Sequence, residues 1–408
     1  MRILFITFYF APDLCAGSFR NTALVEALKE ATEPDDTIDV VTTLPHRYHS
    51  YMPEAKEFEV NGKVHIHRIK IPEHRSGFLD QILSFKTFYT KVLKFVKEEN
   101  YDIVFASSSK LFTAFLGARI ARKKNTLLYL DIRDIFTDTI NDVLNKSALK
   151  IVTKPILGQI EHYTITTADS LNLVSLGFKP YFQSFYNGNT SFYTNGIDEE
   201  FLNIEYQNNT PSGKPKIITY AGNIGEGQGL DEIIPEAAKK LEGSYHFKII
   251  GDGGTKNKLE ARIKELGVSN VEILKPISRK ELPDIYAQSD FLFLHLNDYK
   301  AFRKVLPSKI FEYGATPLPI IAGVDGYART FIQDNLDNAI VFDPKNAEEF
   351  VRKLKKFKPQ YGLRHNFIEK YLRSNIMQEM AKSIIQTKKE EAVTRSFSTS
   401  KIKPSKIW

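Results

Sequence analysis

The sequence has very little cysteine and no long hydrophobic run. Its 408 residues include one cysteine, Cys15, so neither an intramolecular disulfide nor a cysteine zinc cluster can form. Because it has no stretch of about 18 apolar residues, we expect no membrane-spanning helix. The apolar segment 3–11 is too short for a signal peptide and lacks a small-residue cleavage pattern. We therefore expect a cytoplasmic protein, with a position on the inner face of the plasma membrane left open.

The composition is that of a folded globular chain. The formal net charge is +7, with 42% hydrophobic and 26% charged residues, which excludes a wholly disordered or collagen-like protein. The length predicts two or three domains. The mild basic excess is compatible with an anionic partner, such as a phosphate-bearing ligand or a membrane surface. Because the charge is dispersed and no recognised motif is present, we expect no nucleic-acid partner.

Short apolar runs alternate with amphipathic stretches, which predicts an α/β fold with parallel sheets. Strands are expected at 2–8, 38–42, 64–69, 103–106, 126–130 and 170–174, and then at 216–221, 246–250, 271–274, 291–295, 319–322 and 340–342. Residues 206–215 are polar and rich in turn residues, as in a linker. We therefore expect two doubly wound, Rossmann-like domains, 1–204 and 205–385, that face a cleft between them. The last helices could cross back to the first domain. Residues 386–408 are basic and rich in Ser and Thr, and a flexible tail is expected there.

Glycine-rich loops follow three of the expected strands. Gly17 precedes a helix, Gly222 and Gly225 follow strand 216–221, and Gly251 follows strand 246–250. Glycine lets backbone N–H groups approach a phosphate or a sugar. The loop 222–229 has the spacing G-x-G-x-G, which fails the dinucleotide fingerprint by one residue. The two later loops together favour a ligand role, whereas a plain strand–helix turn would also explain the first.

Charged residues stand out at two further places. Glu312 is flanked by Ile310, Phe311 and Tyr313, which predicts a specific hydrogen-bond partner; the alternative is an exposed helix carboxylate. The segment 131–134 follows a buried strand and carries three charges, which is typical of a functional site. Its candidate catalytic residues, for binding the acceptor or the donor sugar, are Asp131, Arg133 and Asp134. An Asp–Arg pair that holds a loop in place is the alternative for this segment.

Five segments, in this order, carry a resemblance to a known family: FYFAPDLCAGSFR, YAGNIGEGQGLDEII, FKIIGDGG, SRKELPDIYAQSDFLFL and PSKIFEYGATPLPIIAG. They resemble the retaining, nucleotide-sugar-dependent glycosyltransferases of family 4, which have the GT-B fold. The branch that includes N-acetyl-fucosamine transferases of O-antigen and capsule synthesis is the most similar. The resemblance implies transfer of an N-acetylated hexosamine or deoxyhexosamine from a UDP-sugar to a lipid-carrier-linked saccharide. Basic surfaces, including the tail, would meet the membrane.

The resemblance also implies roles for individual residues. Glu312 matches the second glutamate of the family's E-x7-E motif, which binds the ribose hydroxyls. Gly17 matches the loop glycine that faces the donor diphosphate, and Pro276 and Ile277 match the segment whose backbone reads the base. The loops that line the donor cleft are matched by Gly222, Gly225 and Gly251.

Three positions depart from the family pattern. Lys304 stands where the first glutamate of E-x7-E is expected, and Asn223 and Gln228 stand where most members have the Arg and Lys that clamp the diphosphate. A diphosphate still needs compensating positive charge. We expect Lys309, Lys304, Arg303 and helix N-termini to supply it.

No D-x-D string and no cluster with metal-ligand spacing occurs in the sequence. We therefore expect no metal and no other cofactor, with positive side chains and helix dipoles stabilising the departing diphosphate. Two alternatives to a glycosyltransferase remain. A nucleotide-sugar epimerase of related fold would release free monosaccharide without an acceptor. A non-catalytic nucleotide-sugar-binding scaffold would bind the donor without turnover.

Overall fold

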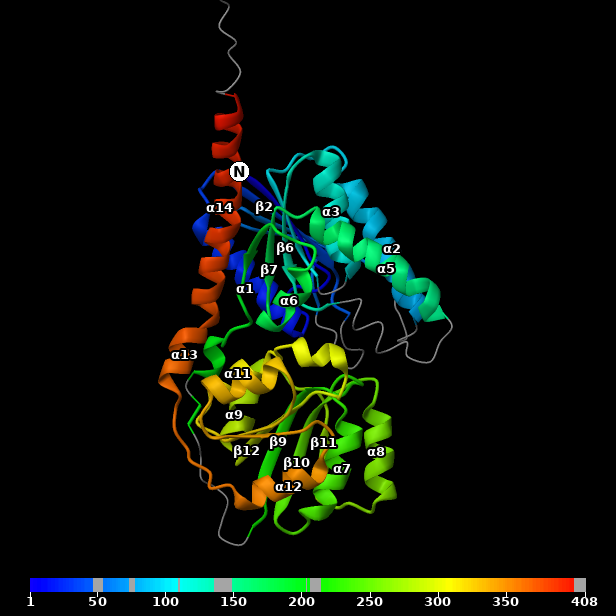
Figure 1. The fold of residues 1–408 in the computed structure, drawn as a ribbon, viewed down its shortest axis with the longest axis vertical. Helices are drawn as coiled ribbons and strands as arrows, with labels where there is room; N and C mark the ends of the chain where they lie inside the picture. Colours follow the sequence, from blue (N-terminus) through cyan, green and yellow to red (C-terminus); the bar gives the residue numbers. More distant parts are fainter. Residues whose placement is uncertain are drawn as a thin grey trace, which may run out of the picture.

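The computed structural model describes residues 1–46, 54–72, 78–108, 111–135, 149–202, 204–205 and 214–399. Two sheets, each formed by one half of the chain and flanked by helices, lie one above the other along the longest axis of the molecule (Figure 1). The expected α/β fold with two doubly wound domains is confirmed. The linker expected at 206–215 lies largely outside the described residues.

The first domain is built on an eight-stranded sheet. In spatial order its strands are β3 (Phe58–Asn61), β4 (Val64–Ile69), β2 (Thr37–Thr43), β1 (Arg2–Ile6), β5 (Ile103–Ser107), β6 (Leu127–Ile132), β7 (Ser170–Leu173) and β8 (Asn189–Ser191). All neighbours are parallel except β3 and β4. The helices are α1 (Ala16–Ala31), α2 (Phe78–Phe95), α3 (Leu111–Lys124), α5 (Leu149–Thr166) and α6 (Lys179–Phe182), with η1 (Leu176–Phe178).

The second domain is built on a six-stranded parallel sheet. Its strands, in spatial order, are β11 (Val271–Leu274), β10 (Tyr245–Asp252), β9 (Lys216–Asn223), β12 (Phe291–His295), β13 (Ile320–Gly323) and β14 (Ala339–Phe342). Its helices are α7 (Leu230–Lys240), α8 (Lys256–Glu265), α9 (Leu282–Ala287), α10 (Lys309–Gly314), α11 (Tyr327–Asn335), α12 (Ala347–Lys356) and α13 (His365–Tyr371). Three short 3-10 helices are η2 (Glu199–Phe201), which precedes this sheet, η3 (Arg279–Glu281) and η4 (Lys300–Lys304).

Both faces of each sheet are buried, which is why the strands appear in the sequence as continuous apolar runs. In β1, Ile3 and Phe5 pack on the side of α1, whereas Leu4 and Ile6 pack on the opposite side with Val92 of α2. Successive side chains of a strand point to opposite faces, so one apolar run contributes to two cores. Every expected strand is present within two residues of its expected ends. β3 (FEVN) and β8 (NTS) are additional, because neither contains an apolar run.

The order of the strands in each sheet indicates where a ligand crevice lies. Strand order reverses between β1 and β5 in the first sheet, and between β9 and β12 in the second. At such a switch point the loops after neighbouring strands separate, leaving a crevice beyond the carboxyl ends of the strands. The loop after β1 and the loop after β9 are therefore the positions from which each domain can contribute to a shared site.

The last helix, α14 (Arg373–Thr399), returns to the first domain, where Figure 1 shows it running past α1. Met377, Met380 and Ile384 are buried there in one cluster with residues of α1 and β5. The flexible tail expected from Gln386 is therefore wrong as far as Thr399. Apolar side chains three and four residues apart fix this helix, and it continues where the composition becomes polar. Lys388, for example, lies 3.3 Å from the Asp102 carboxylate. Residues 400–408 lie outside the described chain.

Candidate functional site

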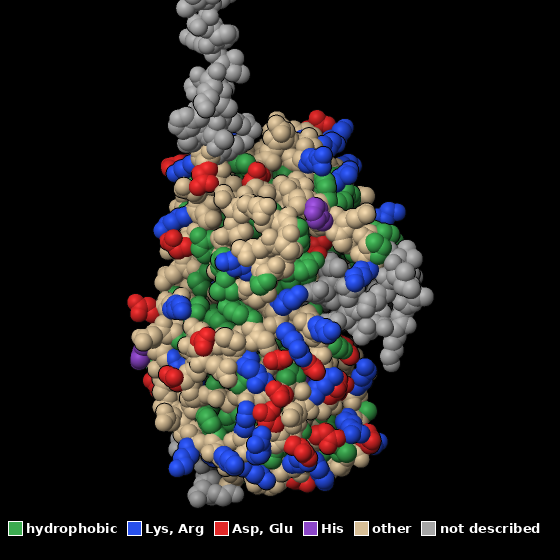
Figure 2. Space-filling model, in the orientation of Figure 1, with side chains coloured by type: hydrophobic (Ala, Val, Ile, Leu, Met, Phe, Trp, Pro, Cys, Tyr) green, Lys and Arg blue, Asp and Glu red, His purple; other side chains and the backbone are tan. Residues whose placement is uncertain are grey.

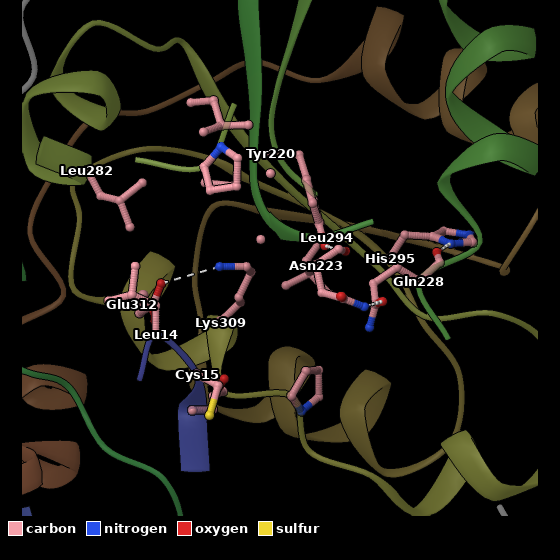
Figure 3. Close-up of a pocket in the computed structure, with 18 of the residues that line it drawn as sticks. Leu14, Cys15, Tyr220, Asn223, Gln228, Leu282, Leu294, His295, Lys309 and Glu312 are labelled. Carbon is pink, nitrogen blue, oxygen red and sulfur yellow. Dashed lines mark hydrogen bonds and ion pairs between the residues drawn. The ribbon is translucent and has the colours of Figure 1, made fainter. Parts of the chain in front are cut away.

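A cavity of about 410 Å³ lies between the two domains, and Figure 3 shows it from close by. The first domain contributes Leu14, Cys15, Ala16 and Phe19, from the start of α1 and the loop before it, together with Asp134 after β6. The second domain contributes the loops after β9, β10 and β11 and the start of α10. We refer to this cavity as the cleft.

Most of the residues expected to bind the donor line the cleft. They are Gly222, Asn223, Gln228, Gly251, Pro276, Ile277, Lys309 and Glu312. Gly17, Gly225 and Lys304 do not line it, and neither do Asp131 and Arg133. The glycine loops of the second domain and the PSKIFEY segment, far apart in the sequence, thus meet at one place.

Glu312 is a buried carboxylate at the wall of the cleft. Lys309 Nζ lies 3.6 Å from its Oε2 (Figure 3), and Arg279 Nη1 lies 3.4 Å from its Oε1. Burial raises the pKa of Glu312, but the nearby cations Lys309, Arg279 and Arg373 lower it by a larger amount. The pKa is therefore below its ordinary value. Within the described chain, Oε2 has no hydrogen-bond partner. Glu312 is therefore a charged acceptor whose Oε2 is ion-paired with Lys309 but makes no hydrogen bond within the described chain, and a ligand hydroxyl would supply that bond.

Lys309 brings a cation to the glycine loops. A β-carbon at Gly222 would lie 2.5 Å from Lys309 Cε, and one at Gly251 would lie 1.8 Å from the Gly222 carbonyl oxygen. Any side chain at either position would displace the lysine or separate the two loops. Crowding therefore requires glycine at Gly251, where the close atom is backbone, whereas at Gly222 the end of the lysine could move and glycine is favoured by the φ of 156°.

Asn223 and Gln228, which stand where the resemblance implies the Arg and Lys of a diphosphate clamp, form a neutral pair. Asn223 Nδ2 donates to Gln228 Oε1 at 2.7 Å (Figure 3). His295, at the end of β12, fixes this loop from behind: its Nδ1 donates to the Gln228 carbonyl at 2.6 Å and its Nε2 accepts from the Lys345 N–H at 3.0 Å. Burial lowers the pKa of His295 to about 4, so the ring is neutral and holds the loop as one tautomer.

Asp131 is buried in an ion pair behind the cleft. Its carboxylate is fully buried and accepts from Arg20 Nε and Nη2, both at 2.9 Å, and from Asn172 Nδ2 at 2.8 Å. Both oxygens are occupied, and Asp131 does not line the cleft, so the structure places it apart from the other candidate site residues. The Asp–Arg pair that the sequence left as an alternative does form, but with Arg20 of α1, which sequence adjacency could not reveal.

The two other charges of this segment lie nearer the cleft. Arg133 Nη1 lies 3.5 Å from the Ala16 carbonyl oxygen, and its guanidinium packs against Gly17 at the start of α1. Asp134 lines the cleft itself. Burial raises the pKa of Asp134 to about 6, although Arg133 offsets part of this rise. Asp134 is thus a first-domain carboxylate that lines the same cavity as the glycine loops of the second domain, with a pKa of about 6.

Lys304 does not serve the cleft. Its Nζ lies 5.2 Å from the centroid of the Tyr181 ring, and its carbonyl accepts from Ser175 Oγ at 2.5 Å. The lysine is therefore directed to the first domain and does not line the cleft, where a donor-binding cation was expected. Arg303 lies 3.1 Å from Asp325 and is half-exposed. Lys309 is the one member of the expected set of cations that lines the cleft.

Arg279 is a cleft residue that the sequence did not single out. It lines the cleft, donates to Asp198 and Glu312, and packs against Phe19 of the first domain. The segment SRKELPDIY contributed to the family resemblance, but nothing in it distinguishes Arg279 from the neighbouring Lys280. Its partners lie 81 and 33 residues away along the chain.

The part of the chain that the structure describes contains no group of three or more His, Cys, Asp or Glu side chains that could hold a metal ion. Each of its helices is too short or too polar to cross a membrane.

Comparisons with known proteins bear on both halves of the chain. Residues 203–372 match the family model described as Glycosyl transferases group 1. A stretch of 107 residues is 36% identical to WcaI of Escherichia coli (strain K12), which carries the name of a colanic acid biosynthesis glycosyl transferase. That stretch spans 26% of this chain and 26% of WcaI.

Solved structures match nearly the whole chain. WaaG, a glycosyltransferase involved in lipopolysaccharide biosynthesis, is similar with a TM-score of 0.62 at 14% identity, over 96% of this chain and 98% of WaaG. Anabaena HepE in complex with UDP is similar with a TM-score of 0.56 at 14% identity, over 97% of this chain and all of HepE. The chain therefore has the GT-B fold, and the match of its second half to glycosyl transferases group 1 supports a glycosyltransferase.

Proposed function

We propose that this protein is a retaining, metal-independent glycosyltransferase of family 4. It would move a sugar from a UDP-sugar to a saccharide on a lipid carrier, in the synthesis of a surface polysaccharide such as O-antigen or capsule. The observation that carries the proposal is Glu312, a buried, ionised carboxylate at the wall of the cleft, whose Oε2 faces Lys309 and makes no hydrogen bond within the described chain. Such a group suits the two hydroxyls of a ribose, because hydrogen bonds to a charged acceptor are strong.

The second domain would hold the donor. With the ribose at Glu312, the base would lie against Pro276 and Ile277, and the diphosphate would face Gly222, Gly251 and Lys309, which all line the same cavity. Lys309 would then stabilise the charge that develops on the diphosphate as it departs. The pair of Asn223 and Gln228 would contribute dipoles in place of cations.

The first domain would present the acceptor. Asp134 reaches the cleft from that side, so it would orient the attacking hydroxyl or the donor sugar. In a same-face displacement the bond from the sugar's anomeric carbon to the diphosphate oxygen breaks, and a bond from that carbon to the acceptor oxygen forms. The proton of the acceptor hydroxyl passes to the departing diphosphate oxygen, so no further general base is needed.

The proposed donor and acceptor are inferred from similarity to other glycosyltransferases. The resemblance to N-acetyl-fucosamine transferases favours an N-acetylated hexosamine or deoxyhexosamine, and the complex of HepE with UDP supports uridine as the base. The names of WcaI and WaaG refer to colanic acid and lipopolysaccharide. Both are surface polysaccharides, which supports a lipid-linked acceptor and a position at the cytoplasmic face of the membrane.

A thermal-shift screen with a panel of nucleotide sugars tests the proposal, because a ligand that binds the folded state raises its melting temperature. UDP-N-acetylhexosamines should give the largest shift. An equal or larger shift with a guanosine diphosphate sugar would contradict the assignment of uridine. No shift with any nucleotide sugar would contradict the proposed donor site.

A non-catalytic scaffold is the second candidate, because the neutral Asn223–Gln228 pair leaves fewer cations in the cleft than a clamp would provide. Tight binding of a UDP-sugar without turnover on any lipid-linked acceptor would favour it. Release of free monosaccharide without an acceptor would instead indicate an epimerase.

A further inference from the structure

Arg279 joins three parts of the molecule. From η3 it lines the cleft, and its Nη1 lies 3.4 Å from Glu312 Oε1. Its Nη2 donates to Asp198, in the segment that leads from the first domain to the second. Its guanidinium carbon lies 4.1 Å from the centroid of the Phe19 ring in α1. One side chain therefore contacts the cleft carboxylate, the interdomain segment and the first domain.

Asp198 belongs to a pair of segments that pass between the domains side by side. The Ile197 N–H donates to the Tyr371 carbonyl, and the Arg373 N–H donates to the Ile197 carbonyl, both at 2.8 Å. Arg373 also holds the Asp198 carboxylate, with Nη2 3.0 Å from Oδ2. Rotation of one domain against the other must bend both segments, so we refer to residues 196–198 and 371–373 as the hinge.

The charges that link the hinge to the cleft are buried. The side chains of Arg279, Asp198 and Glu312 are 10%, 16% and 8% exposed, so their interactions are only weakly screened by solvent. Arg279 is shared between these two carboxylates and the more exposed Glu200, whose Oε1 lies 3.9 Å from its Nε. Its hydrogen bond to Glu312 is long at 3.4 Å. If Asp198 no longer held the guanidinium, we expect it to move closer to Glu312 and to compete with a ligand there.

We propose that Arg279 is a positioning residue that couples nucleotide binding at Glu312 to the geometry of the hinge. The inference rests on the proposed function, because it takes the ligand of Glu312 to be the ribose of a nucleotide. Coupling between two sites is reciprocal: a change at the hinge alters nucleotide affinity, and the nucleotide alters the hinge.

Calorimetric titration of the full-length protein with UDP tests the first direction. Asp198 does not line the cleft, yet Asp198→Asn should weaken UDP binding by about fivefold or more. In an Arg279→Gln background the same change should alter UDP affinity by less than about twofold, because the guanidinium that links Asp198 to Glu312 is already absent. The matched control is Asp290→Asn. Asp290 is a buried carboxylate of the second domain that accepts from the Ile217 N–H at 2.8 Å, and this change should leave UDP affinity as in the wild type.

Hydrogen exchange tests the second direction and does not depend on whether Asp198→Asn folds. Saturating UDP should slow exchange at the Ile197 and Arg373 amides of the wild type, which lie outside the cleft, but not at those of Arg279→Gln. UDP binding that is weakened by Glu312→Gln but unchanged by Asp198→Asn would overturn the coupling alone, as would hinge amides that UDP leaves unaffected. A wild-type protein that binds no UDP would overturn both the coupling and the proposed nucleotide site.

Discussion

At the scale of single residues, cations on three elements keep the cleft carboxylate ionised. Lys309 precedes Glu312 by less than one turn of α10, Arg279 comes from η3 and Arg373 from α14. Together they outweigh the effect of burial on the pKa of Glu312. A carboxylate stabilised in this way keeps its charge without a ligand, so the site needs no change of protonation state before the donor binds.

Replacement of Glu312 should affect catalysis and leave the fold intact. If Glu312 accepts both ribose hydroxyls, Glu312→Ala loses about 1.5–3 kcal/mol or more of transition-state binding. That corresponds to a decrease of roughly ten- to several-hundred-fold in the specificity constant, measured by steady-state kinetics with the donor. The matched control is Glu369→Ala, an exposed carboxylate on α13. Normal turnover by Glu312→Ala would show that Glu312 has no part in donor binding.

Asp134 should give the reaction a pH dependence near neutrality. Its pKa is raised to about 6, so the carboxylate is ionised above that pH and becomes protonated below it. If the ionised form orients the substrate, the specificity constant should fall about tenfold per pH unit below 6. Asp134→Asn should lower activity at pH 8 and remove this acid limb. An acid limb of unchanged midpoint in the variant would assign it to another group.

At the scale of elements, the loop after β9 depends on a histidine from the neighbouring strand. His295 donates to the Gln228 carbonyl and accepts from the Lys345 N–H, which ties this loop to the residues after β14. The bond from Lys345 needs the neutral ring, because a doubly protonated ring has no acceptor nitrogen for the Lys345 N–H, whereas the bond to the Gln228 carbonyl needs only a protonated Nδ1. The position of Gln228 in the cleft is therefore linked to the protonation state of a side chain beneath it.

This linkage predicts acid sensitivity of the fold. The pKa of His295 is about 4 in the folded protein, below its ordinary value of 6.5, so the unfolded chain takes up the proton first as the pH falls. The stabilisation is complete above pH 6.5 and is lost as the pH decreases towards 4. The loss of folding free energy from this histidine between pH 7 and pH 5 should be about 2 kcal/mol. Urea denaturation at the two pH values should show this loss in the wild type and a smaller one in His295→Gln.

The strands and the cleft were predictable from the sequence to different degrees. Strands buried on both faces produce apolar runs, so their places could be predicted within two residues. Glu312 was recognisable because a charge within an apolar helix needs a partner. The ion pair of Asp131 could not be recognised in the same way, because its partner Arg20 lies 111 residues away and sequence proximity suggested Arg133 as the partner. Lys304 likewise depends on Tyr181, a contact that only the packing of the two domains creates.

At the scale of the whole molecule, charge is spread over both domains. On the face that Figure 2 shows, Lys and Arg side chains are interspersed with Asp and Glu, most densely over the second domain. The +7 excess therefore does not form one basic patch on this face. Weak attraction to an anionic membrane would then come from many dispersed cations, including those near the end of the chain.

Co-sedimentation with vesicles that contain anionic lipid should reveal this attraction. Binding should weaken as salt rises, because each Lys or Arg near the surface contributes about 1 kcal/mol that salt screens. Removal of residues 400–408 deletes Lys401, Lys403 and Lys406 and stops beyond α14, so it should weaken binding without disturbing the fold. Neutral vesicles are the control. Binding that depends on neither salt nor this deletion would contradict the electrostatic account.

The return of α14 to the first domain determines the order in which the domains can be completed during synthesis. Leu24 and Phe105 pack with Met377, Met380 and Ile384, so part of the first core is supplied by residues that the ribosome makes after the second domain. The second domain, whose last helix ends at Tyr371, is finished earlier. A nascent chain released before α14 should therefore present a folded second domain joined to a first domain with an uncovered apolar face, and such a face promotes aggregation.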